Sequence, residues 1–141
     1  MNPGKLIHLL YQTTRAISQG LNQMLVPYEL YSSEWSIIMA IKELGPISQI
    51  ALANYLNIEP GAISKSVVRL EQKEFVERKT GNDKREKKVF LTAKALSQYP
   101  IWEKVIDNQR QAILADLSEE KQNELYIMLQ SIYSNSQKHK I

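Results

Sequence analysis

The sequence predicts a mainly α-helical fold with one small β-hairpin, and three observations support this. Apolar residues recur at steps of three and four along most of the 141 residues, which is the spacing of amphipathic helices. Ser, Thr and Gly-Pro stand where these runs begin or end, as helix caps and breakers do. Only two short runs, 75–79 and 87–91, favour β-strands. The turn-prone stretch with Gly-Asn between them predicts a hairpin with a long loop.

The composition excludes several kinds of site. The chain has no cysteine, so it forms no disulfide, no thiolate zinc site and no thiol redox switch. Its two histidines, His8 and His139, lie near opposite ends, so they do not have metal-ligand spacing. The chain has five glycines and neither a phosphate loop nor a Gly-x-Ser-x-Gly elbow. We therefore expect no metal site, no cofactor and no enzymatic activity.

Size and hydropathy predict a cytoplasmic protein of one domain. The sequence has no run of about 18 or more apolar residues, and its N-terminal segment lacks the cleavage pattern of a signal peptide. A length of 141 residues, with 43% hydrophobic and 23% charged residues, is ordinary for one globular domain. We expect that domain to span residues 1–141.

The first two predicted helices have recognisable ends. One covers residues 5–25 and is closed by Pro27. The next begins after Ser33, a favourable N-cap residue, with Glu34 at the positive end of the helix dipole. Gly45-Pro46 ends this second helix.

Two more helices follow, joined by a tight turn. Ser48 caps the first, "QIALANYL", and Pro60 suits the first turn of the second. Ala53 is the small residue expected where the two helices touch, and Asn57 tolerates the positive φ that the turn needs. The outward-facing residues of the second helix are short or cationic: Gly61, Ala62, Ser64, Lys65 and Arg69.

Segments 5–25 and 93–137 carry long apolar stripes outside this central region. Thr92 caps a helix that Pro100 is expected to bend or interrupt, and Ser118 caps the last helix. A core of about 60 residues is too small to cover all these stripes, whereas pairing with a second chain would cover them. We therefore expect dimerisation helices at both ends; the alternative is one larger monomeric bundle.

The order helix, tight turn, helix, hairpin over residues 33–92 is that of a winged helix-turn-helix. Residues 60–90 hold nine Lys or Arg and five Asp or Glu, whereas the rest of the chain holds nine and ten. A local basic excess is the electrostatic footprint of nucleic-acid binding. Ser64, Lys65 and Arg69 could then bond bases or phosphates in the major groove. The alternative is an ordinary amphipathic helix followed by a solvated charged loop.

One acid stands within the basic hairpin loop. Asp83 lies two residues before Arg85, close enough for its carboxylate to hold the guanidinium in place. An arginine aimed in this way suits insertion into a narrow, strongly negative minor groove. Lys84, Lys87 and Lys88 would then contact the DNA backbone, and the alternative is a loop salt bridge without a DNA role.

The segment "DKREKKVFLT" matches the wing signature D-x-R-x5-L-T, and "LANYLNIEPGAISKSVVRLEQKEFVER" is similar to the helix-turn-helix of the same family. The chain thus resembles the MarR (multiple antibiotic resistance regulator) family over nearly its whole length. It departs from the family at Glu74 and Ala95, where the family often has glycine, and at Ser66, where an apolar residue is common.

The resemblance implies a dimeric, sequence-specific regulator of transcription, a repressor of pseudo-palindromic operators that a small aromatic or anionic ligand releases. The alternative is a winged-helix module for protein interaction or DNA architecture that does not read sequence. On the first reading the DNA contacts are Ser48, Gln49, Gly61, Ala62, Ser64, Lys65, Arg69, Asp83, Lys84, Arg85 and Lys87.

The resemblance also implies an effector pocket between the dimerisation helices and the DNA-binding lobe. Aromatic walls with one cation would suit an aromatic anion. The alternative for each candidate is ordinary packing in a core or interface. The residues expected to line this pocket are His8, Tyr11, Arg15, Tyr31, Trp35 and Met39.

Overall fold

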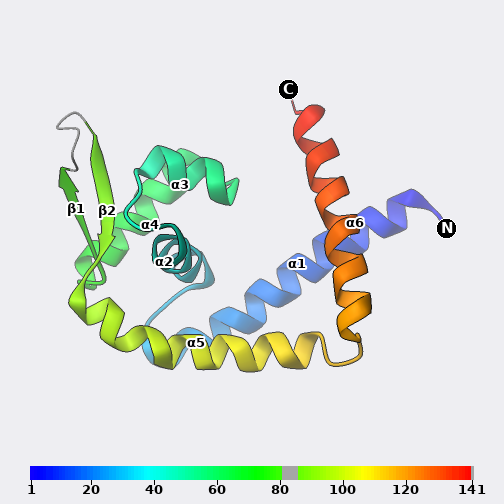
Figure 1. Ribbon diagram of the computed structural model, residues 1–141, viewed down its shortest axis with the longest axis horizontal. Helices are drawn as coiled ribbons and strands as arrows, with labels where there is room; N and C mark the ends of the chain where they lie inside the picture. Colours follow the sequence, from blue (N-terminus) through cyan, green and yellow to red (C-terminus); the bar gives the residue numbers. More distant parts are fainter. Residues whose placement is uncertain (81–85, 141) are drawn as a thin grey trace. The chain divides into compact units, whose positions relative to one another are not determined.

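A computed structural model describes residues 1–80 and 86–140 (Figure 1). It confirms the predicted fold class, mainly helical with one antiparallel hairpin. The chain divides into two units, Met1–Val105 and Ile106–Ile141. In chain order the elements are α1 (Pro3–Leu25), the 3-10 turn η1 (Val26–Tyr28), α2 (Ser32–Leu44), α3 (Gln49–Leu56), α4 (Pro60–Gln72), β1 (Val76–Thr80), β2 (Lys87–Leu91), α5 (Ala93–Ile113) and α6 (Glu119–Lys138).

Three of the predicted helix caps are confirmed by their hydrogen bonds. The hydroxyl of Ser48 accepts from the N–H of Ala51 at 3.1 Å. Thr92 Oγ1 accepts from Ala95 at 3.1 Å, and Ser118 Oγ from Lys121 at 3.2 Å. Each cap satisfies an N–H that the first helical turn leaves without a partner.

The predicted cap at Ser33 is wrong, because α2 begins at Ser32, two residues before the predicted start, and its N-cap residue is Tyr31. The N–H of Ser32 donates to Asn22 Oδ1 of α1 at 2.6 Å. The N–H of Tyr31 donates to the Glu34 carboxylate at 2.9 Å. Side chains from one turn into the helix and from another helix therefore replace the local cap.

Pro100 does not interrupt its helix, since α5 runs from Ala93 to Ile113. The proline costs one backbone hydrogen bond. Its neighbours Tyr99 and Trp102 are buried in the core, which offsets that loss.

The helix-turn-helix of α3 and α4 has the predicted turn. Asn57 adopts the left-handed conformation with φ 54° and ends α3. Ile58 then donates its N–H to the carbonyl of Ala53 at 3.0 Å. Ala53 is buried, as expected for a small residue where two helices meet.

The hairpin is attached to this lobe through its second strand. β1 and β2 pair antiparallel, with Val76 opposite Leu91 and Thr80 opposite Lys87. Ile47, in the link between α2 and α3, exchanges two backbone hydrogen bonds with Val89 of β2, at 2.8 and 3.3 Å. Because Val89 is also fully buried, the start of the helix-turn-helix and the base of the wing form one rigid assembly.

An aromatic cluster forms the centre of the larger unit. The ring of Trp35 on α2 stacks on Tyr99 at 5.3 Å and meets Trp102 edge-on at 6.5 Å. Trp102 in turn lies edge-on to Phe75, at 4.9 Å. These contacts join α2, α5 and the residue that directly precedes β1, and such pairs contribute beyond their buried area.

A buried ion pair ties the end of α4 to the start of α2. The Glu34 side chain is fully buried and accepts from Lys73 Nζ with both carboxylate oxygens, at 2.8 Å each. Lys73 also donates to the carbonyl of Glu29 at 2.7 Å. The carbonyl of Lys73 accepts from Lys94 Nζ at 2.9 Å, so α5 is joined to the same point. From the sequence, Glu34 was expected to interact only with the dipole of its own helix. In the structure its main partner is Lys73, 39 residues away.

Replacing Lys73 by Met is expected to lower the free energy of unfolding by about 3–5 kcal/mol, because it leaves the buried Glu34 carboxylate without a cation. Urea denaturation followed by circular dichroism measures this loss. The double variant Glu34→Gln/Lys73→Met should recover most of it, since no buried charge remains.

The control is Lys79→Met, which breaks the pair that Lys79 forms with Glu77 where both side chains are more than half exposed. It should change the same free energy by less than about 1 kcal/mol. A Lys73→Met variant no less stable than this control would contradict the role of the buried pair.

Candidate nucleic-acid interface

The second helix of the motif, α4, presents a distinct inner and outer face. Ile63, Val67 and Leu70, at helical steps of four and three, are buried. Gly61, Ala62 and Lys65 are exposed on the outer face, while Ser64 is half-buried. The sequence prediction missed two more outward residues, Val68 and Gln72. Val68 lies three residues after Lys65 and four after Ser64, so helical spacing places it beside both.

Ser48 and Gln49, the two predicted DNA contacts at the start of α3, are less exposed than the outer face of α4. Ser48 is buried and its hydroxyl already caps the helix. Gln49 is half-buried in the first turn. Their contact with DNA stays a prediction.

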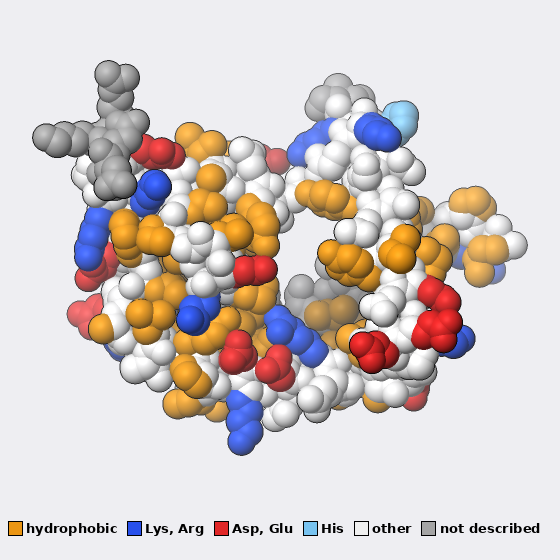
Figure 2. Space-filling view, viewed as in Figure 1, with side chains coloured by type: hydrophobic (Ala, Val, Ile, Leu, Met, Phe, Trp, Pro, Cys, Tyr) orange, Lys and Arg blue, Asp and Glu red, His pale blue; other side chains and the backbone are white. Residues whose placement is uncertain are grey.

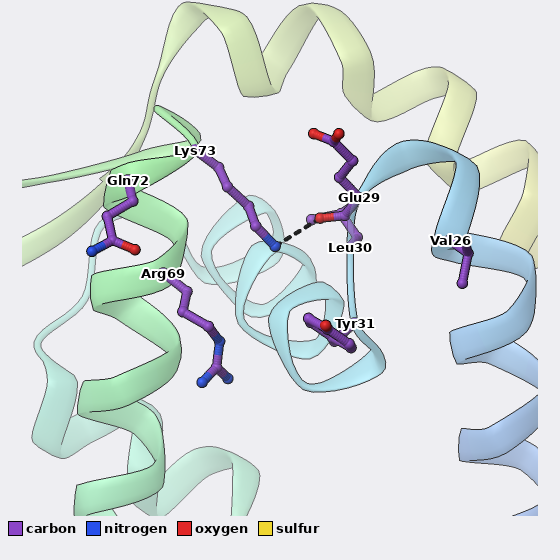
Figure 3. A pocket seen from close by; sticks show the side chains of 7 residues that line it. All are labelled: Val26, Glu29, Leu30, Tyr31, Arg69, Gln72 and Lys73. Atoms are coloured by element: carbon purple, nitrogen blue, oxygen red, sulfur yellow. Dashed lines mark hydrogen bonds between the residues drawn. The ribbon is translucent and has the colours of Figure 1, made fainter.

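Arg69 is placed differently from the expectation that it faces DNA. Its guanidinium Nη2 donates to Ser66 Oγ at 3.0 Å, and the side chain is only half-exposed. It lies on the flank of α4, one turn before Lys73, where α4 meets the segment leading into α2 (Figure 3). The buried hydroxyl of Ser66, a departure from the family pattern, thus serves to orient Arg69.

The wing concentrates positive charge along both strands. Lys79 lies directly opposite Lys88, and Lys87 beside them is exposed. Like charges opposite each other destabilise a hairpin, and the pair that Lys79 forms with Glu77 at 3.0 Å offsets part of this repulsion. Lys and Arg side chains lie along the hairpin edge in Figure 2. The candidates Asp83, Lys84 and Arg85 lie outside the described residues, so their roles stay predictions.

The wing begins at a left-handed residue. Glu74 has φ +65°, and Phe75 donates its N–H back to the carbonyl of Leu70 at 2.9 Å, which ends α4. Thr92 Oγ1 donates to the carbonyl of Glu74 at 2.7 Å. The position where the family often has glycine is therefore left-handed in this chain. The conformation costs a non-glycine residue about 1–3 kcal/mol.

A salt bridge joins the wing to α4. Arg78 Nη2 of β1 lies 2.9 Å from Glu71 Oε1 of α4. Both side chains are about one-third exposed, so the attraction is only partly screened. Together with the Ile47–Val89 bridge, this contact fixes the wing base relative to α4.

A pocket of about 440 Å³ lies on the flank of α4 (Figure 3). A neighbouring hollow of about 370 Å³ shares Tyr31 and Arg69 with it. Arg69 Nε is buried and has no hydrogen-bond partner among the described residues. The pocket is lined by Val26, Glu29, Leu30, Tyr31, Arg69, Gln72 and Lys73.

This pocket shares only Tyr31 with the predicted effector site. Trp35 was expected as a wall, but it is buried in the aromatic cluster, because its ring fills the space between Tyr99 and Trp102. Met39 is half-buried on α2 and does not line the pocket. The three residues from α1 are exposed and do not line it either: His8, Tyr11 and Arg15.

Within α1, the Arg15 guanidinium lies 5.7 Å from the centre of the Tyr11 ring. The two cations that do line the pocket, Arg69 and Lys73, were missed because they stand about 40 residues after Tyr31. No local pattern links residues so far apart.

Comparison with known proteins places the chain in a family. A sequence model of the MarR family matches residues 30–87. An uncharacterized HTH-type transcriptional regulator of Bacillus subtilis (strain 168), YwoH, is 36% identical over 115 residues, covering 82% of this chain and 84% of the relative. This chain belongs to the MarR family. As a MarR-family member it is a DNA-binding regulator of transcription.

Solved structures show the same MarR fold. The regulator BldR from Sulfolobus solfataricus has a TM-score of 0.83 and 27% identity, over 93% of this chain and 94% of that one. A mutant of MarR from E. coli, complexed with operator DNA, has a TM-score of 0.78 and 24% identity, over 92% and 91%. Within the described residues of this chain, no helix is long and apolar enough to span a membrane.

Proposed function

We propose that this MarR-family chain acts in the cytoplasm as a dimeric repressor of a pseudo-palindromic operator, and that a small organic anion releases it. The observation that carries the DNA-binding part is the outer face of α4, which stands free beside a hairpin whose lysines face one another across the strands. The complex of E. coli MarR with operator DNA supports this use of the shared fold.

The terminal helices support the dimer. No residue of α6 is buried, although the helix carries a stripe at helical spacing that includes Leu125, Met128, Leu129 and Ile132. In α1 only Leu25 is buried. Figure 2 shows hydrophobic side chains on the surface of α6. Unpaired apolar stripes of this length are unfavourable in water, and a symmetric partner would cover them.

The substitution Ile132→Glu is expected to convert a dimer into a monomer, because it introduces a charge into the proposed apolar contact. Light scattering coupled to gel filtration measures the molar mass. Gln130→Glu, which adds the same charge at an exposed polar position of α6, should leave the dimer intact. A wild-type protein that is monomeric at micromolar concentration would contradict the dimer.

DNA binding is expected to depend on Lys65 and Arg85. Fluorescence anisotropy with the duplex upstream of the protein's own gene should show tight binding that weakens as salt rises, since bound Lys and Arg release counterions. Lys65→Ala and Arg85→Ala should each weaken binding by about five- to hundredfold. Lys42→Ala, at an exposed cation near the end of α2, should leave it unchanged.

A scrambled duplex serves as the second comparison in this experiment. Weak binding that is equal for both duplexes and unaffected by Arg85→Ala would contradict the proposed mechanism of the wing. It would favour the alternative of an interaction or architectural module.

The pocket on the flank of α4 supports the anionic ligand. Lys73 is already bonded to Glu34 and Glu29, whereas Arg69 has a buried Nε without a partner in the described structure. A carboxylate is the ligand group that a guanidinium binds best. The Tyr31 ring and the side chains of Val26 and Leu30 offer an apolar wall, which suits an aromatic carboxylate. Because Arg69 belongs to α4, an occupied pocket would favour one placement of the recognition helix over another.

Benzoate at millimolar concentration is expected to release the upstream duplex from the wild-type protein, while uncharged benzamide has no effect. Arg69→Met should abolish the benzoate response and leave DNA affinity within about threefold, because Arg69 turns away from the outer face of α4. Lys42→Met should keep the response. If Arg69→Met instead weakens DNA binding and keeps the response to benzoate, then Arg69 is a DNA contact and the anion binds elsewhere.

A further inference from the structure

The outer face of α4 contains an apolar side chain that the fold does not need. Val68 is 38% exposed, whereas its neighbour Val67 is fully buried and fills the core position. A β-branched residue also has a low helix propensity at an exposed position, because its side chain loses conformational entropy in a helix. Helical spacing puts Val68 beside Ser64 and Lys65, the residues proposed to meet the major groove.

Gly61, two helical turns before Val68, is also not explained by the fold. Its backbone is not in the left-handed region, and a Cβ added to it would meet nothing within 4 Å. Gly61 is the second residue of α4, and glycine has a lower helix propensity than alanine, by up to about 1 kcal/mol in a helix interior. The missing side chain therefore leaves room for something outside the chain.

These two observations describe a surface shaped for close approach and for one apolar contact. The face between them carries the short side chains of Ala62 and Ser64 and the cation of Lys65. In the major groove, the apolar group that distinguishes one base from the other three is the C5-methyl of thymine. Two helical turns span about 10 Å, or roughly three base-pair steps, so residues 61 and 68 reach the same half-site.

We propose that Val68 determines operator specificity by packing on the C5-methyl group of a thymine, and that Gly61 lets α4 approach the groove floor closely enough for this contact. The proposal rests on the DNA-binding role of α4 given above and names the base that its outer face selects. The sequence predicted base or phosphate contacts by Ser64, Lys65 and Arg69; the proposal adds Val68 to Ser64 and Lys65 and removes Arg69 from this set.

The test uses a duplex chosen by the protein itself. Wild-type protein selects its best binding site from a library with a randomised centre, and each thymine of that site is then replaced by deoxyuridine, which removes only the methyl group. One thymine in each half-site should lose about fourfold in affinity when replaced, the value of one buried methyl group. With Val68→Ala protein, replacement of that thymine should have no effect.

Two controls keep this result specific. Leu44→Ala removes another exposed apolar side chain of the same lobe, at the end of α2, and should keep the sensitivity to deoxyuridine. Gly61→Ala should unfold at the same or a higher temperature than wild type, yet bind the selected duplex at least about tenfold more weakly, because the added methyl group occupies the space for the groove.

Each contrary outcome has its own meaning. If a site is selected but no deoxyuridine replacement weakens binding, or if Val68→Ala keeps the sensitivity, the thymine contact is wrong while the repressor function stands. Unchanged binding by Gly61→Ala overturns the close approach. If the selection enriches no sequence, then sequence-specific binding fails, and the thymine contact fails with it.

Discussion

The ion pair between Glu34 and Lys73 is the constraint on which the rest of this structure depends. A fully buried carboxylate is tolerable only with a cation and satisfied oxygens, and Lys73 provides both from the last turn of the recognition helix. The same lysine holds the carbonyl of Glu29, and its own carbonyl accepts from Lys94. The C-terminal end of α4 is therefore fixed to α2 and to α5 at one point, and the wing begins directly after it.

With one end fixed, α4 presents three faces with different surroundings. The inner face, with Ile63 and Leu70, belongs to the core. The outer face, with Gly61, Lys65 and Val68, is free for the groove. The flank with Arg69 borders a pocket shared with the segment entering α2. A ligand on that flank and DNA on the outer face would bind the same helix, and coupling between the two sites requires that each favour a different placement of it.

Several features near these surfaces cost stability, and they gather where function is proposed. Glu29 and Glu74 both adopt positive φ, and their backbone carbonyls accept hydrogen bonds from Lys73 and Thr92. Lys79 lies opposite Lys88 in the wing. Departures from locally favourable choices are expected at functional sites, where the surrounding structure holds them in place.

Local patterns in the sequence determined the elements of this protein and most of their ends. Ser48, Thr92 and Ser118 cap helices as predicted, and Asn57 makes the left-handed turn, because caps and turns depend on residues only a few positions apart. The wing signature around Asp83 and Arg85 likewise predicted the family without any structure.

Only the tertiary structure decided which side chains meet. It placed Trp35 in the core, turned Arg69 into a pocket, and paired Glu34 with a lysine 39 residues away. It also left Val68 exposed on the outer face of α4, beside buried Val67. The physical reason is that burial and pairing depend on how helices pack against one another, and packing is set by contacts between segments far apart in the chain.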